Sequence, residues 1–254
     1  MIYISPTINV LNKSIRNIGR KLLRDFNEVE NLQNSIKSIQ PFLNKTKLKL
    51  KKQIEFDLKR IKKNYDICFF DENLSYESED TWIVDVLNGS SNFQKAIPHF
   101  CIAIGLIEKK ETIISSIYDP IKDELYFSQK GKGSYINEYR LKLTEKSSVN
   151  LSTIAVSRIS TINNSKKMKI IFDKFDQIRI FGCDLLDFCY LANGKIDAVV
   201  FQDANKSSLE IGKIITKEAS AIIIENIEGS EYSISCNKNM EREIRNILSE
   251  KVEI

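Results

Sequence analysis

The chain has 254 residues, of which 42% are hydrophobic and 28% charged, a composition typical of a globular protein with one large core. The formal net charge of +4 does not by itself identify a nucleic-acid-binding protein. No apolar run approaches the roughly 20 residues that span a bilayer, and the first ten residues lack the pattern of a signal peptide, so we expect a cytoplasmic protein without membrane contact.

Helical and extended patterns follow one another along the chain. Apolar residues at helical spacing predict helices over residues 7–26 and about 48–63, although residues 47–51 alternate like a strand. Strands are expected over residues 67–70, 82–86, 101–107, 113–118, 124–127, 134–136, 154–156, 178–181, 198–201 and 222–224. Further helices are expected over residues 166–175, 185–192, 209–219 and 240–250. This mixture predicts a layered α/β architecture.

Nine basic residues lie between Lys45 and Lys63, where only Glu55 and Asp57 are acidic. Two interpretations remain open: a solvated helix face in a lysine-rich protein, or a docking surface for RNA or an acidic protein. The single histidine, His99, excludes a His-rich metal site and is expected to be structural. The five cysteines show no C-x-x-C spacing and are expected to be reduced and buried.

The segment W-I-V-D-V-L-N-G-S-S-N-F over residues 82–93 is the most informative part of the chain. An apolar run brings Asp85 to a strand end, and the polar turn N-G-S-S follows over residues 88–91. If such a turn opens a helix, its backbone N–H groups suit an oxyanion such as phosphate. A nearby carboxylate is what a hard cation bridging to that phosphate requires.

This segment resembles the signature of the inositol monophosphatase family, W-x-x-D-P-x-D-G-T-x-N-F. Later segments match the family in order, including Asp119-Pro120, residues 179–198 and Glu218-Ala219, so the resemblance covers about residues 7–250. It implies the αβαβα sandwich of Mg²⁺-dependent sugar phosphatases, usually a homodimer. The implied domain spans residues 1–254 as two intimate halves, an N-terminal α+β half over about residues 1–145 and a C-terminal α/β half over about 146–254.

The resemblance places a metal and phosphate site around the signature turn. It aligns Asp71 with a glutamate that binds metal and positions water, and Asp85 with an aspartate shared between two Mg²⁺ ions. The Leu87 carbonyl and the Asn88 side chain align with further metal ligands. The implied catalytic residues are Asp71 and Ser90, and the implied substrate or phosphate contacts are Asn88, Gly89, Ser90, Ser91, Gly182 and Ser208.

Several of these positions lack the residue that the family uses. Asn88 and Ser208 replace aspartates, Lys47 replaces the carboxylate that serves a third metal, and Phe201 replaces a glutamate that grips a sugar hydroxyl. The first three replacements change the formal charge of the implied metal cluster by about +4, and unit charges at such distances interact by several kcal/mol. Mg²⁺ binding is therefore expected to be weak or lost, with the Lys47 ammonium a candidate to stand in for a metal ion.

Three hypotheses about function follow. The first is a member close to the bacterial SuhB-like branch, with phosphomonoesterase activity weak or lost and a regulatory role with RNA polymerase or RNA, because some members of that branch are associated with RNA polymerase and ribosomal RNA transcription. The alternative is an active Mg²⁺-dependent phosphatase for inositol 1-phosphate or a related small sugar phosphate, with Glu72, Asp203 or Glu210 supplying missing carboxylates. The third is a dimerising scaffold that only keeps the fold.

Overall fold

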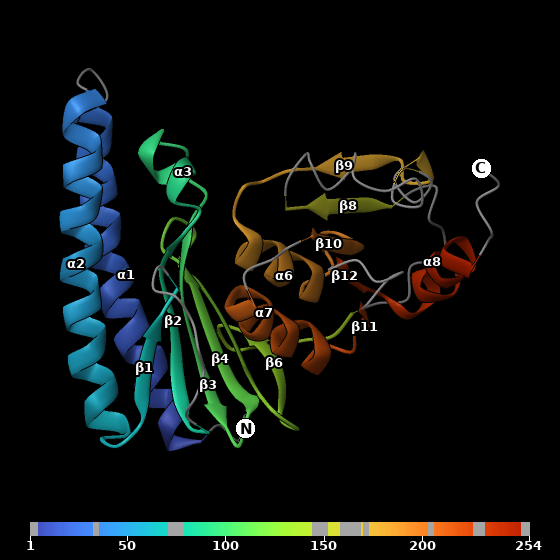
Figure 1. Cartoon of the computed structure of the whole chain (residues 1–254), viewed down its shortest axis with the longest axis horizontal. Coiled ribbons are helices and arrows are strands. Elements are labelled where there is room, and N and C mark those ends of the chain that lie inside the picture. The colour runs from blue at the N-terminus through green and yellow to red at the C-terminus, as the bar shows by residue number, and fades with distance from the viewer. Residues whose placement is uncertain are drawn as a thin grey trace.

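The computed structural model describes residues 5–32, 36–70, 79–143, 152–157, 169, 173–202, 206–225 and 232–249. These residues form five layers (Figure 1). Helices α1 (Pro6–Leu32) and α2 (Ile36–Ile61) cover the outer face of a seven-stranded sheet. Helices α6 (Asp184–Ala192) and α7 (Lys206–Glu218) lie between this sheet and a five-stranded sheet, and α8 (Lys238–Ser249) covers the far side of the second sheet. The expected αβαβα layering is confirmed.

The seven-stranded sheet is a meander in which each strand pairs with the next in the chain. Its strands are β1 (Asp66–Phe69), β2 (Thr81–Asn88), β3 (Cys101–Glu108), β4 (Glu111–Asp119), β5 (Glu124–Gln129), β6 (Gly133–Ile136) and β7 (Tyr139–Leu141). Only the β1–β2 pair is parallel among the described strands of this sheet. A short helix, α3 (Ser90–Gln94), follows β2 directly and leads the chain back into β3.

The five-stranded sheet has the order β11-β12-β10-β8-β9. Its strands are β8 (Thr153–Val156), β9 (Gln177–Arg179), β10 (Ala198–Gln202), β11 (Ile222–Glu225) and β12 (Tyr232–Cys236). The central strand β10 is parallel to β8 and antiparallel to β12. Side chains of α6 pack on one face of this sheet and side chains of α8 on the other, so the central strands β8 and β10 are buried from both sides.

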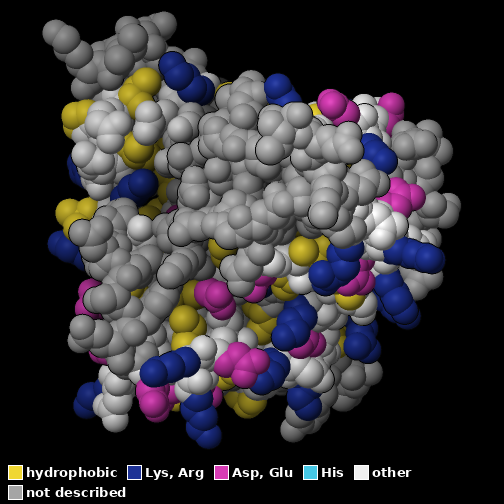
Figure 2. Space-filling view, turned by 45° about the vertical axis from the view of Figure 1, so that its right-hand side comes forward, with side chains coloured by type: hydrophobic (Ala, Val, Ile, Leu, Met, Phe, Trp, Pro, Cys, Tyr) yellow, Lys and Arg dark blue, Asp and Glu magenta, His cyan; other side chains and the backbone are white. Residues whose placement is uncertain are grey.

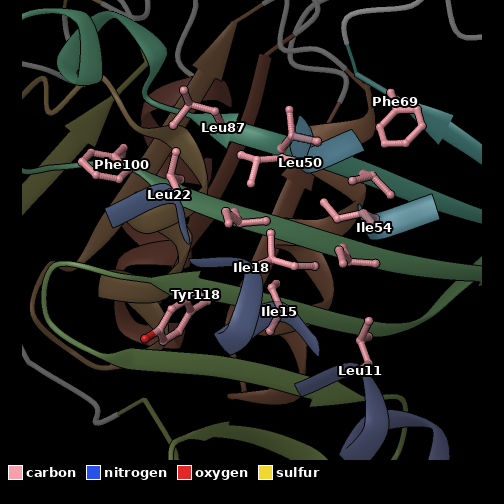
Figure 3. Packing of buried hydrophobic residues seen from close by; sticks show 14 of the residues in the cluster. Leu11, Ile15, Ile18, Leu22, Leu50, Ile54, Phe69, Leu87, Phe100 and Tyr118 are labelled. Carbon is pink, nitrogen blue, oxygen red and sulfur yellow. The ribbon is translucent and has the colours of Figure 1, made fainter. Parts of the chain in front are cut away.

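The largest core lies between the α1–α2 layer and the first sheet (Figure 3). Leu11, Ile15, Ile18 and Leu22 recur at intervals of three or four residues along α1, and all four are buried. A Cβ atom added at Gly19 would lie 2.3 Å from the ring of Tyr118, so the glycine lets α1 approach β4 closely. This packing fixes the helical layer against the strands that lead to the signature turn.

Helix α2 begins twelve residues before the expected start, and the strand-like interpretation of residues 47–51 is wrong. Leu48 is 55% exposed and Leu50 only 3% exposed, because two residues along a helix turn the side chain to the opposite side. In a strand both would lie on one face. The strand β12 was not predicted, and most of the helix expected over residues 166–175 lies outside the described residues. Within the described segments, none of the helices combines the length and the apolar character that membrane crossing requires.

Candidate functional site

The signature turn begins at a one-residue bulge in β2. Asp85 pairs with Ala103 of β3, but the next paired residue is Asn88, which faces Cys101. Three steps along β2 therefore match two steps along β3, and the extra residue bends the strand. The bend brings the side chains of Asp85 and Asn88 into direct contact, with the Asn88 Nδ2 group donating a hydrogen bond to Asp85 Oδ2 at 2.9 Å.

Both carboxylate oxygens of Asp85 accept hydrogen bonds from its own turn. The backbone N–H of Leu87 donates to Oδ1 at 3.0 Å, while the Asn88 amide donates to Oδ2. Hydrogen bonds from neutral donors to an ionised carboxylate are short and strong. They also occupy lone pairs that a carboxylate would otherwise offer to a metal ion.

The side-chain oxygen of Asn88 is engaged on the opposite side, by the start of α6. It accepts hydrogen bonds from the backbone N–H of Leu185 at 3.1 Å and from the Cys183 thiol at 3.2 Å. The first N–H groups of a helix have no partner within the helix, so Asn88 satisfies one of them. An amide can donate to Asp85 and accept from α6 at the same time, whereas an ionised carboxylate can only accept.

The predicted phosphate-binding residues lie together at the turn. Gly89 has φ +80°, and a Cβ atom there would lie 2.8 Å from the carbonyl oxygen of His99. Ser90 and Ser91 form the first turn of α3, and neither hydroxyl hydrogen-bonds another described residue. The turn is therefore closely packed at Gly89, and the helix that follows it begins with two serine hydroxyl groups.

Asn92 ties this turn to the predicted substrate side of the site. Its side-chain amide donates to the carbonyl oxygen of His99 at 2.9 Å and to that of Phe181 at 2.8 Å, with Gly182 O at 3.5 Å. Gly182, a predicted contact residue, therefore lies beside the signature turn although 93 positions separate it from Gly89 in the chain. We did not assign this bridging role from the sequence, since it depends on where α6 packs.

Lys47 is half-buried in α2. It lies three and seven residues before Leu50 and Ile54, which puts it on the sheet-facing side of the helix. The neighbouring Lys51 lies 4.9 Å from the ring centroid of Phe69 at the end of β1. The sheet-facing side of α2 therefore presents two lysines toward β1. Asp71 follows β1 in the sequence but lies outside the described residues.

Phe201 does not reach the turn, and some other predicted positions cannot be compared with it because their side chains lie outside the described part. Phe201 is 1% exposed and stacks on Phe188, with 4.6 Å between ring centroids, so it belongs to the core and not to a ligand pocket. Ser208 lies in α7, but its side chain is outside the described part, as are Glu72 and Asp203.

Glu210 cannot supply a missing carboxylate, and that expectation is wrong. It accepts a hydrogen bond from Thr112 at 3.2 Å. Thr112 pairs with Ile107 of β3, whereas Asn88 pairs with Cys101. Six residues of a strand separate those two positions, about 20 Å at the rise of a β-strand. Glu210 therefore lies near the opposite end of the sheet.

Two titratable side chains near the turn have solvent-shielded polar atoms without a hydrogen-bond partner among the described residues: Nε2 of the half-buried His99 and both carboxyl oxygens of Asp187. The His99 ring packs against Phe181 and Tyr190, and burial, with Lys122 adding to it, lowers the pKa of His99 to about 4. This neutral, aromatic environment agrees with the expected structural role. Asp187 of α6 is 0% exposed, and neither of its carboxyl oxygens hydrogen-bonds another residue that the structure describes. Burial, followed by the charge of Asp184, raises the pKa of Asp187 well above its ordinary value, so we assign it as a neutral carboxylic acid.

The cysteines are free, as expected, and all but the half-buried Cys68 are buried. Cys101 and Cys183 approach to 3.8 Å between sulfur atoms beneath the turn. Burial raises the pKa of both thiols, which keeps them protonated and unreactive. Sequence reasoning missed Cys183 as a neighbour of the site, whereas Asp187 lies in the stretch over residues 179–198 that the resemblance matched.

The described residues alone supply few of the ligands that a pair of Mg²⁺ ions would need. Mg²⁺ requires several hard oxygen ligands in near-octahedral geometry. Among the side chains that the structure describes, no three His, Cys, Asp or Glu residues converge in a way that could hold a metal ion. At the signature turn the described members of the implied ligand set are the Leu87 carbonyl, Asp85, which is hydrogen-bonded to its own turn, and the oxygen of Asn88, which is hydrogen-bonded to α6.

Comparisons with known proteins agree with the resemblance seen in the signature. The family model for the inositol monophosphatase family matches residues 4–230. The chain is 30% identical over 232 residues to the Nus factor SuhB of Buchnera aphidicola subsp. Schizaphis graminum, covering 89% of this chain and 86% of that protein. It is 26% identical over 260 residues to the inositol-1-monophosphatase of Rhizobium meliloti, covering 98% of each.

Solved structures show the same fold. The extragenic suppressor protein suhB from Bartonella henselae superposes with a TM-score of 0.81 at 22% identity, covering 98% of this chain and 100% of that one. The Thermotoga maritima IMPase gives a TM-score of 0.80 at 20% identity, covering 95% and 96%. The expected fold type is therefore confirmed.

Proposed function

Because this chain belongs to the inositol monophosphatase family, we propose that it is a SuhB-like member in which phosphomonoesterase activity is weak or lost and a regulatory binding role remains. Proteins of this family are generally Mg²⁺-dependent. The proposal rests on one observation, the double engagement of Asn88 between Asp85 and α6.

The chemistry of that contact carries the argument. Where the family signature has a second aspartate, two carboxylates would face each other and a cation between them would balance their charge. Here the amide of Asn88 meets Asp85 directly, so the two side chains are complementary without a cation. Lys47, on the sheet-facing side of α2, adds positive charge toward the same layer. Both features weaken the attraction for Mg²⁺.

The names of similar proteins support the regulatory role. Several similar proteins, including those of Buchnera aphidicola and Pasteurella multocida, are named Nus factor SuhB. We propose RNA polymerase or RNA as the partner of this chain, which implies a cytoplasmic location. We also propose a homodimer. Ile97 and Ile180 are 48% and 47% exposed on the two loops that Asn92 joins, and they offer an apolar surface for a second copy.

A second candidate function is hydrolysis of inositol 1-phosphate or a related small sugar phosphate. The specific observation that favours it is the preserved turn, where Gly89 keeps its left-handed conformation and the hydroxyls of Ser90 and Ser91 remain available to a phosphate. In that case Asp71 and Ser90 are the catalytic residues, with Asp71, Asp85, Asn88 and the Leu87 carbonyl as metal ligands. The name of the Rhizobium meliloti relative accords with this function.

A phosphatase assay separates the two functions. The purified protein is tested in millimolar Mg²⁺ on inositol 1-phosphate and a panel of other phosphomonoesters, beside the variant Lys47→Asp/Asn88→Asp/Ser208→Asp. We expect little or no chelator-sensitive turnover by the unmodified protein and a gain of Mg²⁺ binding by the variant. Robust, chelator-sensitive turnover by the unmodified protein would refute the proposed loss of activity.

The partner and the dimer need separate measurements. Capture of purified RNA polymerase, with and without ribonuclease treatment, tests the polymerase and RNA arms independently. Light scattering after size exclusion tests the dimer, which Ile97→Asp/Ile180→Asp should convert to a monomer. A monomeric unmodified protein at micromolar concentration would remove the dimer from the proposal.

A further inference from the structure

The outer face of α2 carries a row of basic side chains with an exposed aromatic ring among them. We define the α2 stripe as the exposed residues Lys45, Leu48, Lys49, Lys52, Phe56 and Arg60. Their spacing of one to four residues keeps them on the side opposite the buried Leu50, Ile54 and Leu58. At a rise of 1.5 Å per residue, the stripe extends about 22 Å from Lys45 to Arg60.

The charges of the stripe are not neutralised by the rest of the described protein. Lys45, Lys49 and Lys52 form no ion pair with any residue that the structure describes. Lys59, by contrast, pairs with Glu55 one turn away and is not included in the stripe. The remaining cations are therefore available to an anionic partner.

The helical hairpin also differs in charge from the rest of the chain. The sequences of α1 and α2 together contain 13 Lys and Arg against five Asp and Glu, a net charge of +8. Since the whole chain carries +4, the remainder carries −4. Figure 2, with the side of α8 turned forward, shows Lys and Arg interspersed with Asp and Glu over that part of the surface. The excess of positive charge is thus confined to the α1–α2 layer.

Phe56 makes the stripe more than a charged surface. Its side chain is 60% exposed, and the Arg60 guanidinium lies over the ring at 5.7 Å from the centroid. An exposed aromatic ring beside an arginine is a stacking platform for an unpaired base, and neighbouring lysines can contact the phosphates of the same strand. The two apolar residues of the stripe, Leu48 and Phe56, lie two helical turns apart, so the stripe lacks the contiguous apolar core that is typical of a stable protein interface.

We infer that the α2 stripe binds single-stranded RNA, with Lys45, Lys49, Lys52 and Arg60 on the phosphates and a base stacked at Phe56. This inference specifies the RNA partner of the proposed function and does not depend on the state of the phosphatase site. Binding of this kind is governed by counterion release, so the affinity falls as salt rises, with a slope of about −0.7 for each neutralised phosphate.

The test measures fluorescence anisotropy of a labelled unstructured RNA of about 12 nucleotides between about 50 and 200 mM salt. The variant Lys45→Gln/Lys49→Gln/Lys52→Gln should bind at least tenfold more weakly at the lowest salt, and its salt slope should be smaller by about 2. The matched control Lys110→Gln/Lys174→Gln/Lys238→Gln removes three exposed lysines elsewhere and should bind as the unmodified protein does. An equal loss in both variants would overturn the assignment of the surface.

The stacking contact is tested separately. Phe56→Ala should weaken RNA binding by about tenfold, within the range for loss of one stacked base, while Leu48→Ala should leave it unchanged. Circular dichroism confirms that both variants fold. Equal weakening by both substitutions, or stronger competition by an acidic peptide than by RNA, would identify an acidic protein and not RNA as the partner of the stripe. Tighter binding of a DNA strand of the same sequence would also overturn the assignment to RNA.

The two proposals fail independently. Phosphatase turnover by the unmodified protein would refute the loss of activity without affecting the stripe. Absence of RNA binding at low salt would refute the stripe and leave the Asn88 argument intact.

Discussion

The side-chain amide of Asn88 donates to the carboxylate of Asp85 at 2.9 Å, while its oxygen accepts the backbone N–H of Leu185 at 3.1 Å. One neutral side chain therefore joins the end of the first sheet to the helix that lies between the two sheets. Both of its polar ends are satisfied, which matters because a half-buried polar group without a partner is costly. These hydrogen bonds hold the two side chains together, as a cation would hold two carboxylates together.

Replacement of this amide by a carboxylate should be destabilising in the absence of divalent ions. We expect Asn88→Asp to lower the free energy of unfolding by about 1–3 kcal/mol at neutral pH, because Asp85 loses a donor and gains a like charge. Like-charge repulsion raises the pKa of the pair in the folded state, so the loss should shrink as pH falls and one carboxyl is protonated. Urea unfolding in chelator at two pH values measures both effects.

Asn88→Ala is the control for this prediction, because it removes the same hydrogen bonds without adding charge and should show no such pH dependence. Added Mg²⁺ should stabilise Asn88→Asp more than the unmodified protein. If Asn88→Asp is as stable as the unmodified protein in chelator at neutral pH, the assigned role of the amide is wrong.

Gly89 is required by both its backbone and its surroundings. We expect Gly89→Ala to destabilise the protein by more than the 1–2 kcal/mol of a left-handed alanine, because its Cβ atom would lie 2.8 Å from the His99 carbonyl oxygen and 3.2 Å from Cys183 Cβ. Gly131→Ala is the matched control, since Gly131 also has positive φ but no atom within 4 Å of an added Cβ. Thermal unfolding of both variants separates the cost of the left-handed backbone from the cost of the steric contact. Equal losses of stability would contradict the close packing around Gly89.

The buried carboxyl of Asp187 should make stability fall as pH rises. The pKa of Asp187 in the folded state lies above the unfolded value of about 4. Its contribution to stability is therefore fully present below about pH 4 and is lost as the pH rises toward the folded pKa. Asp187→Asn removes this titration. The free energy of unfolding of the variant, relative to that of the unmodified protein, should therefore increase from acid to mildly alkaline pH. Urea unfolding at one acid and one mildly alkaline pH measures this change. A difference that does not change with pH would show that Asp187 is solvated or paired.

His99 should act in the opposite direction. Burial lowers its folded pKa to about 4, below the unfolded value of about 6.5, so stability is lost as pH falls through that interval. The full shift in pKa corresponds to about 3 kcal/mol, and solvent screening reduces this because the ring is only half-buried. His99→Phe keeps a ring between Phe181 and Tyr190 and should remove this loss, so that its melting temperature exceeds that of the unmodified protein at pH about 4.5 by more than at neutral pH. No difference between the two pH values would contradict the burial of the imidazole.

Much of the fold could be predicted from the sequence because its elements have regular apolar spacing. The strands β2 to β5 have such spacing and were predicted close to their observed bounds, and α1 was predicted close to its observed start but extends six residues beyond the expected end. The first half of α2 could not be predicted, because Pro41 disfavours a helix interior and the Lys-Leu alternation suggests a strand. The strand β12 was missed although Tyr232, Ile234 and Cys236 alternate with Ser233 and Ser235 in the pattern of a strand.

The candidate site could be predicted only in part. The substitution at Asn88 is evident from the sequence, but the partners of its oxygen, Cys183 and Leu185, lie 95 and 97 positions further along the chain. Their contact depends on how α6 packs between the two sheets. The failed expectation for Glu210 has the same origin, since its neighbour Thr112 lies near the far end of β4 and sequence distance does not reveal this.

The unequal division of charge between the helical hairpin and the remainder makes the molecule an electrical dipole. In the field of a polyanion such a molecule experiences a torque that turns its positive side forward during diffusion. Capture rates should then depend steeply on ionic strength, while escape rates depend on the contacts formed afterwards. The orientation in which the protein meets such a partner is thus selected before any side chain touches it.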